Sequence, residues 1–519
     1  MIAPPRHASN RSRLRLQSRP RGAATGLAVL ALLTGLLVGA APVPDVEALP
    51  LPDGDIANVE LVGQAPEAVQ ATAINFMTYG QGNSARDIMF VNGRFGLQSY
   101  DLADPAQPQL LDHLTSEELK LPSDVSGTFW QNEDMDVDED RKLVFMARDP
   151  RAYSGSTNNP DSIAGVYIID VGDPEDLSLR LFHELPSGHT STCVNDCDFL
   201  WTGGPASNPE QSAEWPGGRP VFVTDVRDLD NVTTFETPVD TGRDDGESAY
   251  AHDVQVDAAG IAWVSGRGGV RGYHTSGRHL DPTVGVRRVA TAWDPVPFAG
   301  GGFPEGSVPS GFMHNSFRPV GSTLRAGGNP TPEHRPGSLI MATEEAFGSS
   351  TCDGVGMFSI ASLEGSTDGE GWASTPDDPF RLDIVGQWSP AGEEGTIPNA
   401  FCSAHYFEVQ NNVVAYSWYA QGTRFLDVSD PTDPIQIAYY RPNGGVSWAP
   451  YFHGDYIYVA DNARGVDVLR LTTAAEQASA AHAQVNAPAM SQGQIARIEA
   501  MAARYRPDPE LGWSCVIPL

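Results

Sequence analysis

The sequence is poor in positive charge, and only two of its residues are lysines, Lys120 and Lys142. Its 33 Lys and Arg residues stand against 66 Asp and Glu residues, which gives a formal net charge of −33. A chain this acidic repels the phosphates of nucleic acids and of anionic lipids. We therefore expect no nucleic-acid partner and no binding to anionic membrane surfaces.

Motifs of several common enzyme classes are also missing. No Gly-x-Ser-x-Gly segment is present, so a serine hydrolase of that kind has no support. The Gly-rich stretches 266–272 and 300–302 lack the strand-to-helix context of a phosphate-binding loop, so we expect no nucleotide cofactor. Carboxylates occur throughout the chain, which prevents the selection of a glycosidase-like pair.

Only one long apolar run is present, from Ala23 to Ala41. Five arginines between Arg11 and Arg21 precede it, and the small residues at 39–41 end it. This order is typical of a secretory signal peptide at 1–41 followed by a linker at 42–54, although the run is also near the length of a single membrane anchor. Cleavage would leave a secreted or extracytoplasmic protein without a membrane span, and we expect a monomer.

One stretch, Phe401–Pro442, contains the segments of a complete four-stranded unit. Residues 405–410 alternate toward an Asn-Asn turn, and the β-branched and aromatic runs at 413–419, 423–428 and 435–440 predict three further strands. The pattern therefore predicts an all-β unit with short turns between neighbouring strands.

The third strand of this unit recurs together with the turn that follows it. Copies lie at 96–105 (GLQSYDLADP) and 166–174 (VYIIDVGDP), with a weaker copy at 221–228 (VFVTDVRD). Asp suits the bend because its side chain can accept a hydrogen bond from its own backbone, and Pro cannot donate to a continuing sheet. An apolar strand followed by Asp-Val and an Asp-Pro turn resembles the LVIVD-repeat family of β-propeller proteins. The resemblance implies a ring of repeated blades but no single activity.

Repeats of this spacing point to one closed array rather than to several domains. We predict a seven-bladed β-propeller at 55–471, closed by the strand-like segment 58–64, because the last repeat at 451–471 has only three strands of its own. The outer half of the fourth blade is predicted at 270–293, followed by a loop at 294–311. The first strands of the blades are predicted to begin near Ile74, Glu133, His189, His252, His314, His405 and Pro450.

After the last repeat, residues 472–519 have a different composition. Ala and Gln are frequent up to about residue 506, which predicts a tail that is helical or disordered. No second long apolar run follows, so the sequence indicates release rather than anchoring.

The chain has five cysteines, and four of them fall into pairs on the predicted blades. Cys193 and Cys197 bracket a short turn between the first two strands of the third blade. This favours a disulfide over a metal site, because no second short-spaced pair is present. Cys352 and Cys402 lie on loops expected on the same face of neighbouring blades and form a second candidate bridge. Cys515 is left over, and its partner is unknown.

Alignment of the repeats places acidic and imidazole side chains at one position. Glu133 aligns with His252. Arg148 follows Glu133 by 15 residues, and Arg267 follows His252 by the same distance. The corresponding positions of three other blades hold His189, His314 and His405. Because innermost strands line the channel of a propeller, these side chains should converge at one mouth. Converging imidazole nitrogens suit zinc, copper or iron.

The second strands end at the same mouth and bring further charged residues near it. We predict Arg148 and Arg267 as binding groups for an anionic substrate, since guanidinium groups make bidentate contacts with anions. Glu344 and Glu345 could orient the ligand imidazoles, or one of them could act as a base. Glu133 is predicted as a metal ligand or a base.

Two functions remain open from the sequence. The axial placement of the histidines is similar to that in carotenoid oxygenases and selenium-binding methanethiol oxidases, propellers whose axial histidines hold iron or copper, although no motif is shared with either. This placement favours a metal-dependent oxidoreductase over a hydrolase. Alternatively, the polar residues only bridge neighbouring strands, and the chain is a non-catalytic extracellular module whose long loops bind a protein or a glycan. Under either hypothesis the partner is an extracellular small molecule, protein or glycan that the sequence does not identify.

Overall fold

The computed structural model describes residues 54–486 with internal gaps, of which the longest are 242–250, 302–310, 320–338 and 363–382. These residues belong to one compact unit, Leu51–Leu519. The predicted signal peptide at 1–41, nearly all of the linker and the end of the tail lie outside the described residues. Their assignment stays a prediction.

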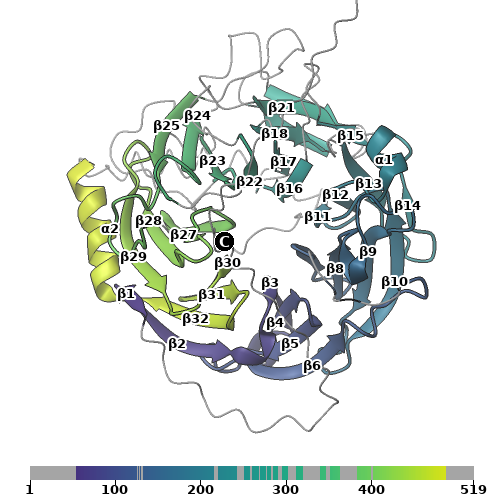
Figure 1. Cartoon of the computed structure of the whole chain (residues 1–519), viewed down its shortest axis with the longest axis horizontal. Coiled ribbons are helices and arrows are strands. Elements are labelled where there is room, and N and C mark those ends of the chain that lie inside the picture. The colour runs from purple at the N-terminus through teal and green to yellow at the C-terminus, as the bar shows by residue number, and fades with distance from the viewer. Residues whose placement is uncertain are drawn as a thin grey trace, which may run out of the picture. The chain divides into compact units, whose positions relative to one another are not determined.

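Seven antiparallel sheets stand around a central channel as the blades of a β-propeller (Figure 1). Within each blade, the first three strands follow one another in the sequence and lie side by side from the innermost strand outward. The innermost strands begin within a few residues of their predicted starts. The predicted all-β, seven-bladed fold is therefore confirmed.

The strands of blades 1 to 3 are β3 (Ala71–Tyr79), β4 (Arg86–Gly93), β5 (Gly96–Asp101) and β6 (Gln109–Thr115); β7 (Met135–Asp138), β8 (Leu143–Arg148), β9 (Ala164–Asp170) and β10 (Ser178–Leu185); and β11 (Thr190–Val194), β12 (Phe199–Gly203), β13 (Pro220–Asp225) and β14 (Thr233–Thr234), with β15 (Val239–Asp240) also paired to β13. Those of blades 4 and 5 are β16 (Ala251–Val256), β17 (Ile261–Gly266), β18 (Gly269–His274) and β21 (Val296–Gly301); and β22 (Met313–Phe317), β23 (Leu339–Glu344), β24 (Phe358–Ser362) and β25 (Asp383–Trp388). Those of blades 6 and 7 are β26 (Phe407–Gln410), β27 (Val413–Ser417), β28 (Thr423–Asp427) and β29 (Ile435–Arg441); and β30 (Ser447–His453), β31 (Tyr456–Asp461) and β32 (Gly465–Leu471).

The ring is closed by the N-terminal strand β2 (Val59–Ala65), which forms the outermost strand of blade 7 beside β32. The pairing runs from Val59 opposite Leu471 to Ala65 opposite Val466. The predicted closure is confirmed, and it covers the edge that β32 would otherwise expose. The sequence did not indicate β1 (Asp55–Ala57), which adds a fifth strand to blade 6 by pairing with β29.

The hydrophobic core is divided among the seven interfaces between blades. Each of the seven clusters of buried apolar side chains is built mainly from two neighbouring blades, and one of them joins blade 7 to blade 1. Between blades 5 and 6, for example, Trp388 and Trp418 pack edge to face with their ring centroids 6.0 Å apart. Because each blade buries its faces against two others, the innermost strands are fixed relative to the channel.

Blade 4 departs from the prediction in its outer half. Its fourth strand, β21, lies in the segment predicted as a loop, and the separate hairpin of β19 (Gly277–Asp281) and β20 (Gly285–Val289) precedes it. Pro297 and Gly300 gave the segment a loop-like composition, because proline cannot donate to a sheet and glycine weakens a strand. At the outer edge of a blade proline is tolerated, since one side of the strand needs no hydrogen-bonded neighbour.

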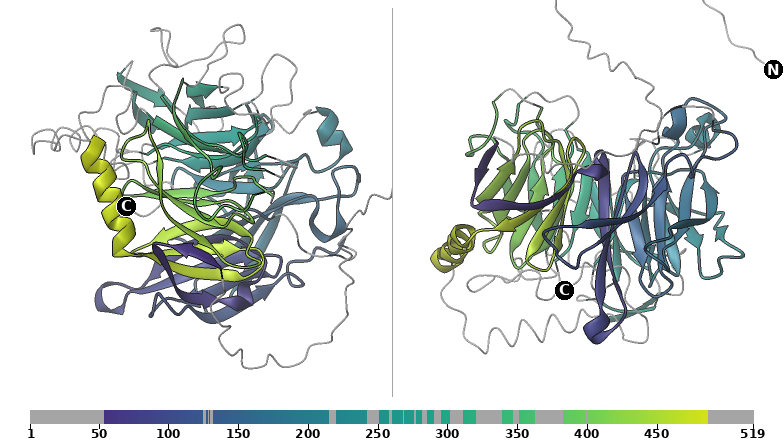
Figure 2. Two further views of the ribbon diagram at one scale, coloured as in Figure 1. Left: turned by 60° about the vertical axis from the view of Figure 1, so that its left-hand side comes forward. Right: turned by 90° about the horizontal axis from the view of Figure 1, so that it is seen from below.

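Two α-helices accompany the sheets in the part of the chain that the structure describes, α1 (Pro209–Glu214) and α2 (Thr473–Asn486). Helix α2 follows the last strand and packs on the outside of the ring, where Ala475 joins the core cluster between blades 6 and 7 (Figure 2). The helical tail is confirmed over this range. None of the described helices is long and apolar enough to span a membrane. Short 3₁₀ turns lie at Pro66–Ala68, Gly82–Ser84 and Ala152–Ser154.

Both predicted disulfides are formed. Cys193–Cys197 closes the turn between β11 and β12, and Cys352–Cys402 joins a loop of blade 5 to the segment before β26 in blade 6. Cys515 lies outside the described residues. The two bridges are compatible with an oxidising compartment.

Candidate metal centre

Five innermost strands each present one buried polar side chain at the same level of the channel. These side chains belong to Glu133, His189, His252, His314 and His405, which lie in or just before β7, β11, β16, β22 and β26. The pairing of β16 with β17 slips at His252, and the pairing of β22 with β23 slips across His314. Such bulges turn a side chain out of the regular alternation of a strand. They allow the imidazoles to meet at the channel instead of packing between blades.

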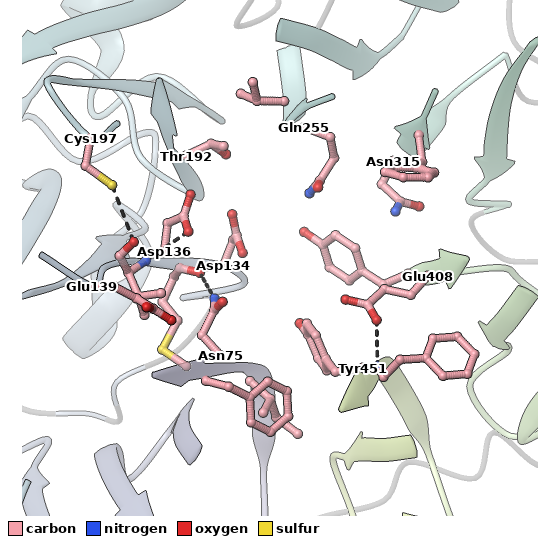
Figure 3. Close-up of a pocket in the computed structure, with 18 of the residues that line it drawn as sticks. Asn75, Asp134, Asp136, Glu139, Thr192, Cys197, Gln255, Asn315, Glu408 and Tyr451 are labelled. Carbon is pink, nitrogen blue, oxygen red and sulfur yellow. Dashed lines mark hydrogen bonds between the residues drawn. The ribbon is translucent and has the colours of Figure 1, made fainter. Parts of the chain in front are cut away.

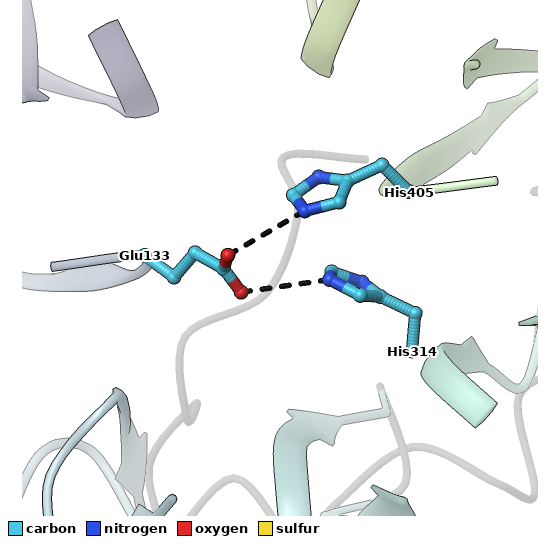
Figure 4. Close-up of side chains that lie close together, drawn as sticks. All are labelled: Glu133, His314 and His405. Carbon is cyan, nitrogen blue, oxygen red and sulfur yellow. Dashed lines mark ion pairs between the residues drawn. The ribbon is translucent and has the colours of Figure 1, made fainter. Parts of the chain in front are cut away.

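The four imidazoles converge on the carboxylate of Glu133. Its Oε2 atom lies 2.9 Å from Nε2 of His189, 3.2 Å from Nε2 of His252 and 3.5 Å from Nε2 of His314. Its Oε1 atom lies 3.5 Å from Nε2 of His405. Figure 4 shows Glu133 reaching between His314 and His405 from the opposite side. The structure thus brings together all four predicted ligand histidines and the predicted glutamate.

Three of the four imidazoles are held in place by their Nδ1 atoms. Each Nδ1 faces an oxygen: Asp149 Oδ2 at 3.0 Å for His189, the His314 carbonyl at 2.8 Å for His252 and the Trp448 carbonyl at 2.7 Å for His405. Carbonyl and carboxylate oxygens only accept, so Nδ1 carries the hydrogen, and in the neutral imidazole Nε2 keeps its lone pair. Histidine ligands of metals are oriented by the same kind of bond.

The Nε2 atoms also face one another. Those of His189 and His252 lie only 3.1 Å apart. Two lone pairs at this distance repel each other unless a proton or a metal ion lies between them. The neighbouring rings continue the cluster, with centroid distances of 4.2 Å from His252 to His314 and 3.9 Å from His314 to His405. The geometry therefore requires a positive charge near the centre.

Without a metal, that charge would be a proton on His189. Burial lowers the pKa of His189, but Glu133 and Asp149 outweigh it and raise this pKa to about 10. Burial acts to raise the pKa of Glu133, yet the facing imidazoles, His189 first, hold it well below its usual range. Burial and the neighbouring His405 and His252 lower the pKa of His314 well below its usual value. A metal-free cluster thus holds an imidazolium beside a carboxylate.

A protonated His189 does not satisfy the whole cluster. Among the described residues, three buried atoms find no hydrogen-bond partner here even then: both ring nitrogens of His314 and Nε2 of His405. Each buried polar group left in this state costs about 1–3 kcal/mol. A metal ion bound to the Nε2 atoms would remove most of this cost.

The spacing of the donor atoms suits a single ion. Ligand atoms about 2.1 Å from a metal lie roughly 3.0–3.4 Å apart at octahedral or tetrahedral angles. The separations between Glu133 and the Nε2 atoms run from 2.9 to 3.5 Å. Three sets of candidate ligand atoms lie within 4.8 Å of one another, namely Glu133 with His314 and His405, Glu133 with His189 and His252, and His252 with His314 and Glu345. The residues present therefore fit a transition metal with mainly nitrogen ligands.

Glu345 borders the cluster, whereas Glu344 serves the adjoining loop. Glu345 Oε2 lies 3.9 Å from His314 Nε2, and its Oε1 accepts a hydrogen bond of 2.5 Å from the Tyr419 hydroxyl. Glu344 Oε2 accepts the backbone N–H groups of residues 356 and 357 at 2.9 and 3.3 Å. The structure keeps Glu345 as a candidate ligand or base. Glu344 holds the chain between β23 and β24 through these bonds, and its predicted catalytic role stays a prediction.

The two arginines predicted to hold an anionic substrate differ in their surroundings. Arg148 is buried and forms a bidentate ion pair with Asp124, with nitrogen to oxygen distances of 2.5 and 2.9 Å, and it donates to the Tyr167 hydroxyl at 2.7 Å. Its guanidinium is committed to these partners, so we assign it a structural role instead. Arg267 is exposed and forms an isolated bridge with Phe312. The predicted role of Arg267 stays a prediction.

The residues that hold the cluster in place were missed by the sequence analysis. Asp149 and Tyr419 lie in irregular segments after second strands, and Trp448 acts through its backbone carbonyl. A backbone carbonyl leaves no signal in a sequence. Only Asp149 could have been found, because it directly follows a second strand that returns to the level of the histidines.

Comparisons with known proteins establish no family for this chain. No family model matches it, and no curated protein matches it. Among solved structures, the WD40 β-propeller domain of Doa1 aligns with a TM-score of 0.40 and 7% identity over 82% of this chain and 96% of that one. The periplasmic gluconolactonase PpgL of Pseudomonas aeruginosa aligns with a TM-score of 0.43 and 14% identity over 77% and 96%. Likenesses at this level say nothing of activity, and membership of the LVIVD-repeat family stays a prediction.

Proposed function

We propose that this chain is a metal-dependent oxidoreductase whose ion is bound by His189, His252, His314 and His405, with Glu133 as a further ligand or as a base. The observation that supports the proposal is the set of buried Nε2 atoms that face one another while Nδ1 atoms are tied to fixed oxygens. Copper, iron and zinc all accept imidazole ligands. Bound copper or iron would supply redox chemistry, whereas zinc would direct the site toward hydrolysis.

A purely structural role explains the contacts of the Nδ1 atoms of His252 and His405 but gives no reason for a second ring nitrogen. A side chain that bridges two blades needs one donor, and the Nδ1 atoms of His252 and His405 already bond to carbonyls of the next blade. Threonine hydroxyls make the same kind of bridge, at 2.6 Å from Thr190 to the His252 carbonyl and at 2.9 Å from Thr343 to the His405 carbonyl. The Nε2 atoms of His314 and His405 take part in no such bridge among the described residues, which favours the ligand role for them.

Glu345 and Tyr419 would add proton transfer beside the ion. Burial raises the pKa of Glu345, and the Tyr419 hydroxyl donates to its Oε1 atom. A carboxyl group in this state can hold a proton at Oε2 and release it toward the cluster. We also propose that the protein works outside the cytoplasm, which the leader and the two disulfides support. That it is a monomer stays a prediction.

The proposal can be tested with substitutions that keep the bridges between blades. Asn carries its amide nitrogen on Cγ, as His carries Nδ1, so His252→Asn and His405→Asn retain a donor for the carbonyl and lose Nε2. We expect near-stoichiometric copper, iron or zinc in the parent purified without chelators, and a loss of most of it in both variants. His183→Asn is the matched control, because His183 lies on the outer strand β10 and bonds to Thr234. Its metal content should equal that of the parent.

A parent that takes up none of the three metals would overturn the proposal. It would favour the alternative of a non-catalytic extracellular module that binds a protein or a glycan through its long loops. Full metal content in both folded Asn variants would show that the metal lies elsewhere. If zinc is the only metal retained, the centre is hydrolytic and the oxidoreductase assignment is wrong.

A further inference from the structure

A cavity of about 660 Å³ lies in the channel (Figure 3), and the chain neighbours of the candidate ligands line it. All seven blades line it. In the five blades that carry a candidate ligand, the lining begins one to three residues after that ligand, as Asp134 follows Glu133 and Tyr406 follows His405. A cavity of this volume accommodates a small organic molecule.

The wall of this cavity is acidic. Seven of the lining residues are Asp or Glu, and no Lys, Arg or His of the described part of the chain is among them. Two of these carboxylates are already bound by the protein: Asp136 accepts the N–H of Cys193 at 2.7 Å, and Asp138 pairs with Arg141 at 2.6 Å. Asp134 and Glu408 face the same space from blades 2 and 6 (Figure 3). Carboxylates without facing cations disfavour an anionic ligand, although burial and the neighbouring Asp253 raise the pKa of Asp134 well above its usual range.

Glu408 is a carboxyl group of the wall with no cation of the described residues beside it. Its Oε2 atom accepts one hydrogen bond, from the N–H of Phe452 at 2.6 Å. Burial raises the pKa of Glu408 to about 8. Burial deprives this carboxylate of water, so a cation that enters the cavity and pairs with it stabilises the ionised form.

A tyrosine in the wall provides an independent sign of a ligand. Tyr406 is 93% buried, as its exposed fraction is 7%, and its hydroxyl has no hydrogen-bond partner. Leaving a buried hydroxyl unpaired is unfavourable by about 1–3 kcal/mol unless a further group meets it. Tyr451 lines the same cavity, so two aromatic rings as well as carboxylates are available to a bound molecule.

We propose that this cavity binds a small aryl-alkyl ammonium compound and presents it to the metal centre as its substrate. Asp134 and Glu408 would face the ammonium group, and Tyr406 and Tyr451 would pack on the apolar part and on the cation. The identity of the ligand as a substrate rests on the proposed function, whereas its binding does not. A bare divalent ion would leave most of the volume and both tyrosine rings unused.

The test is calorimetric titration of the metal-free protein at pH 8.5, where Glu408 is mostly ionised, with three probes of similar shape. Phenethylammonium should bind at least about tenfold more tightly than the neutral 2-phenylethanol, and the anionic phenylacetate should not bind. Glu408→Gln should weaken phenethylammonium binding about tenfold or more, and Tyr406→Phe should weaken it severalfold. Glu60→Gln, a surface change on β2, should leave it unchanged.

The two proposals fail separately in this experiment. Equal binding of the neutral and cationic probes, no binding of either, or binding of calcium without phenethylammonium would overturn the cation site. Metal content measured on the same Glu408→Gln protein should stay at the parental level. Metal uptake without amine binding would leave the proposed metal centre intact and refute the cavity's role. Amine binding in a parent that never takes up metal would leave the cation site intact and refute the proposed metal centre.

Discussion

Replacement of Asp149 by Asn should weaken metal binding without unfolding the protein. Asp149 is fully buried, and its Oδ2 atom accepts the hydrogen of His189 Nδ1 at 3.0 Å. Loss of a partner that orients a metal-bound histidine typically lowers affinity about 10- to 100-fold, or about 1.4–2.7 kcal/mol. Arg151 shares the same carboxylate, with nitrogen to oxygen distances of 2.8 and 2.7 Å. Since this guanidinium already neutralises part of the Asp149 charge, we expect a loss of metal affinity near the lower end of that range.

The measurement is a competition titration against a chelator of known affinity, with parent and variant at one pH and with the metal found in the parent. Asp427→Asn is the matched control. Asp427 is equally buried, and its Oδ1 atom lies 2.5 Å from His482 Nδ1, but this pair joins β28 to helix α2 on the outside of the ring. The same chemical change there should leave metal affinity unaltered.

Two results would refute the reasoning. Equal affinities of the parent and the folded Asp149→Asn variant would mean that the bond to Nδ1 does not orient a ligand. An equal loss in Asp427→Asn would mean that affinity follows general loosening of the propeller. Circular dichroism of all three proteins separates both cases from simple unfolding.

Three further predictions concern stability. Because burial raises the pKa of Glu408 from 4.5 to about 8, the folded state retains a proton that the unfolded chain has lost, and stability falls as pH rises between these values. Glu408→Gln should therefore gain stability over the parent from pH 5 to pH 8 in urea unfolding, and a constant difference would contradict this. Replacing both Cys352 and Cys402 by Ser removes a bridge that spans 50 residues and should lower the free energy of unfolding by about 4 kcal/mol. Replacing both Cys193 and Cys197 by Ser removes a bridge that spans 4 residues and should lower it by about 2 kcal/mol. Equal losses would argue that the stabilisation does not come from the entropy of the unfolded chain. His482→Ala removes a buried ion pair and should make α2 sensitive to limited proteolysis, with metal content unchanged. An α2 as resistant as that of the parent would show that the apolar contacts of Ala475 and its neighbours alone hold the helix on the ring.

The fold was predictable from the sequence because its signals are local and repeated. An apolar strand with its Asp turn needs only adjacent residues, and the turns form as expected, with Asp170 accepting the N–H of Gly172 at 2.9 Å. The closing strand was found because blade 7 lacked a strand. By contrast, β1 is three residues long and has no repeat to compare with, and β21 contains a proline that only an edge position tolerates.

The candidate site was predictable only in part. One repeat position supplied the histidines and Glu133, because every blade offers the same position to the channel. The repeats could not show what the neighbouring residues do, since those lie in irregular segments that differ from blade to blade. Arg148 illustrates the limit: it shares its spacing with Arg267, but its buried pairing with Asp124 depends on a residue 24 positions away. Only the folded chain distinguishes a free guanidinium from one that is already bound.

The distribution of residues around the ring also bears on what the histidines do. A bridge is needed at each of seven interfaces, whereas a metal takes four to six ligands. The imidazoles and Glu133 occupy five consecutive blades, 2 to 6. In blades 1 and 7 the equivalent positions, where the strand pairing also slips, are Thr72 and Trp448. Thr72 donates to the Asn132 carbonyl at 2.8 Å, next to Glu133, and the Trp448 carbonyl receives the Nδ1 hydrogen of His405. The bridges thus continue through the two blades without imidazoles, so bridging alone does not explain why histidine is confined to one arc of the ring. Binding of a single ion explains both its confinement and its number.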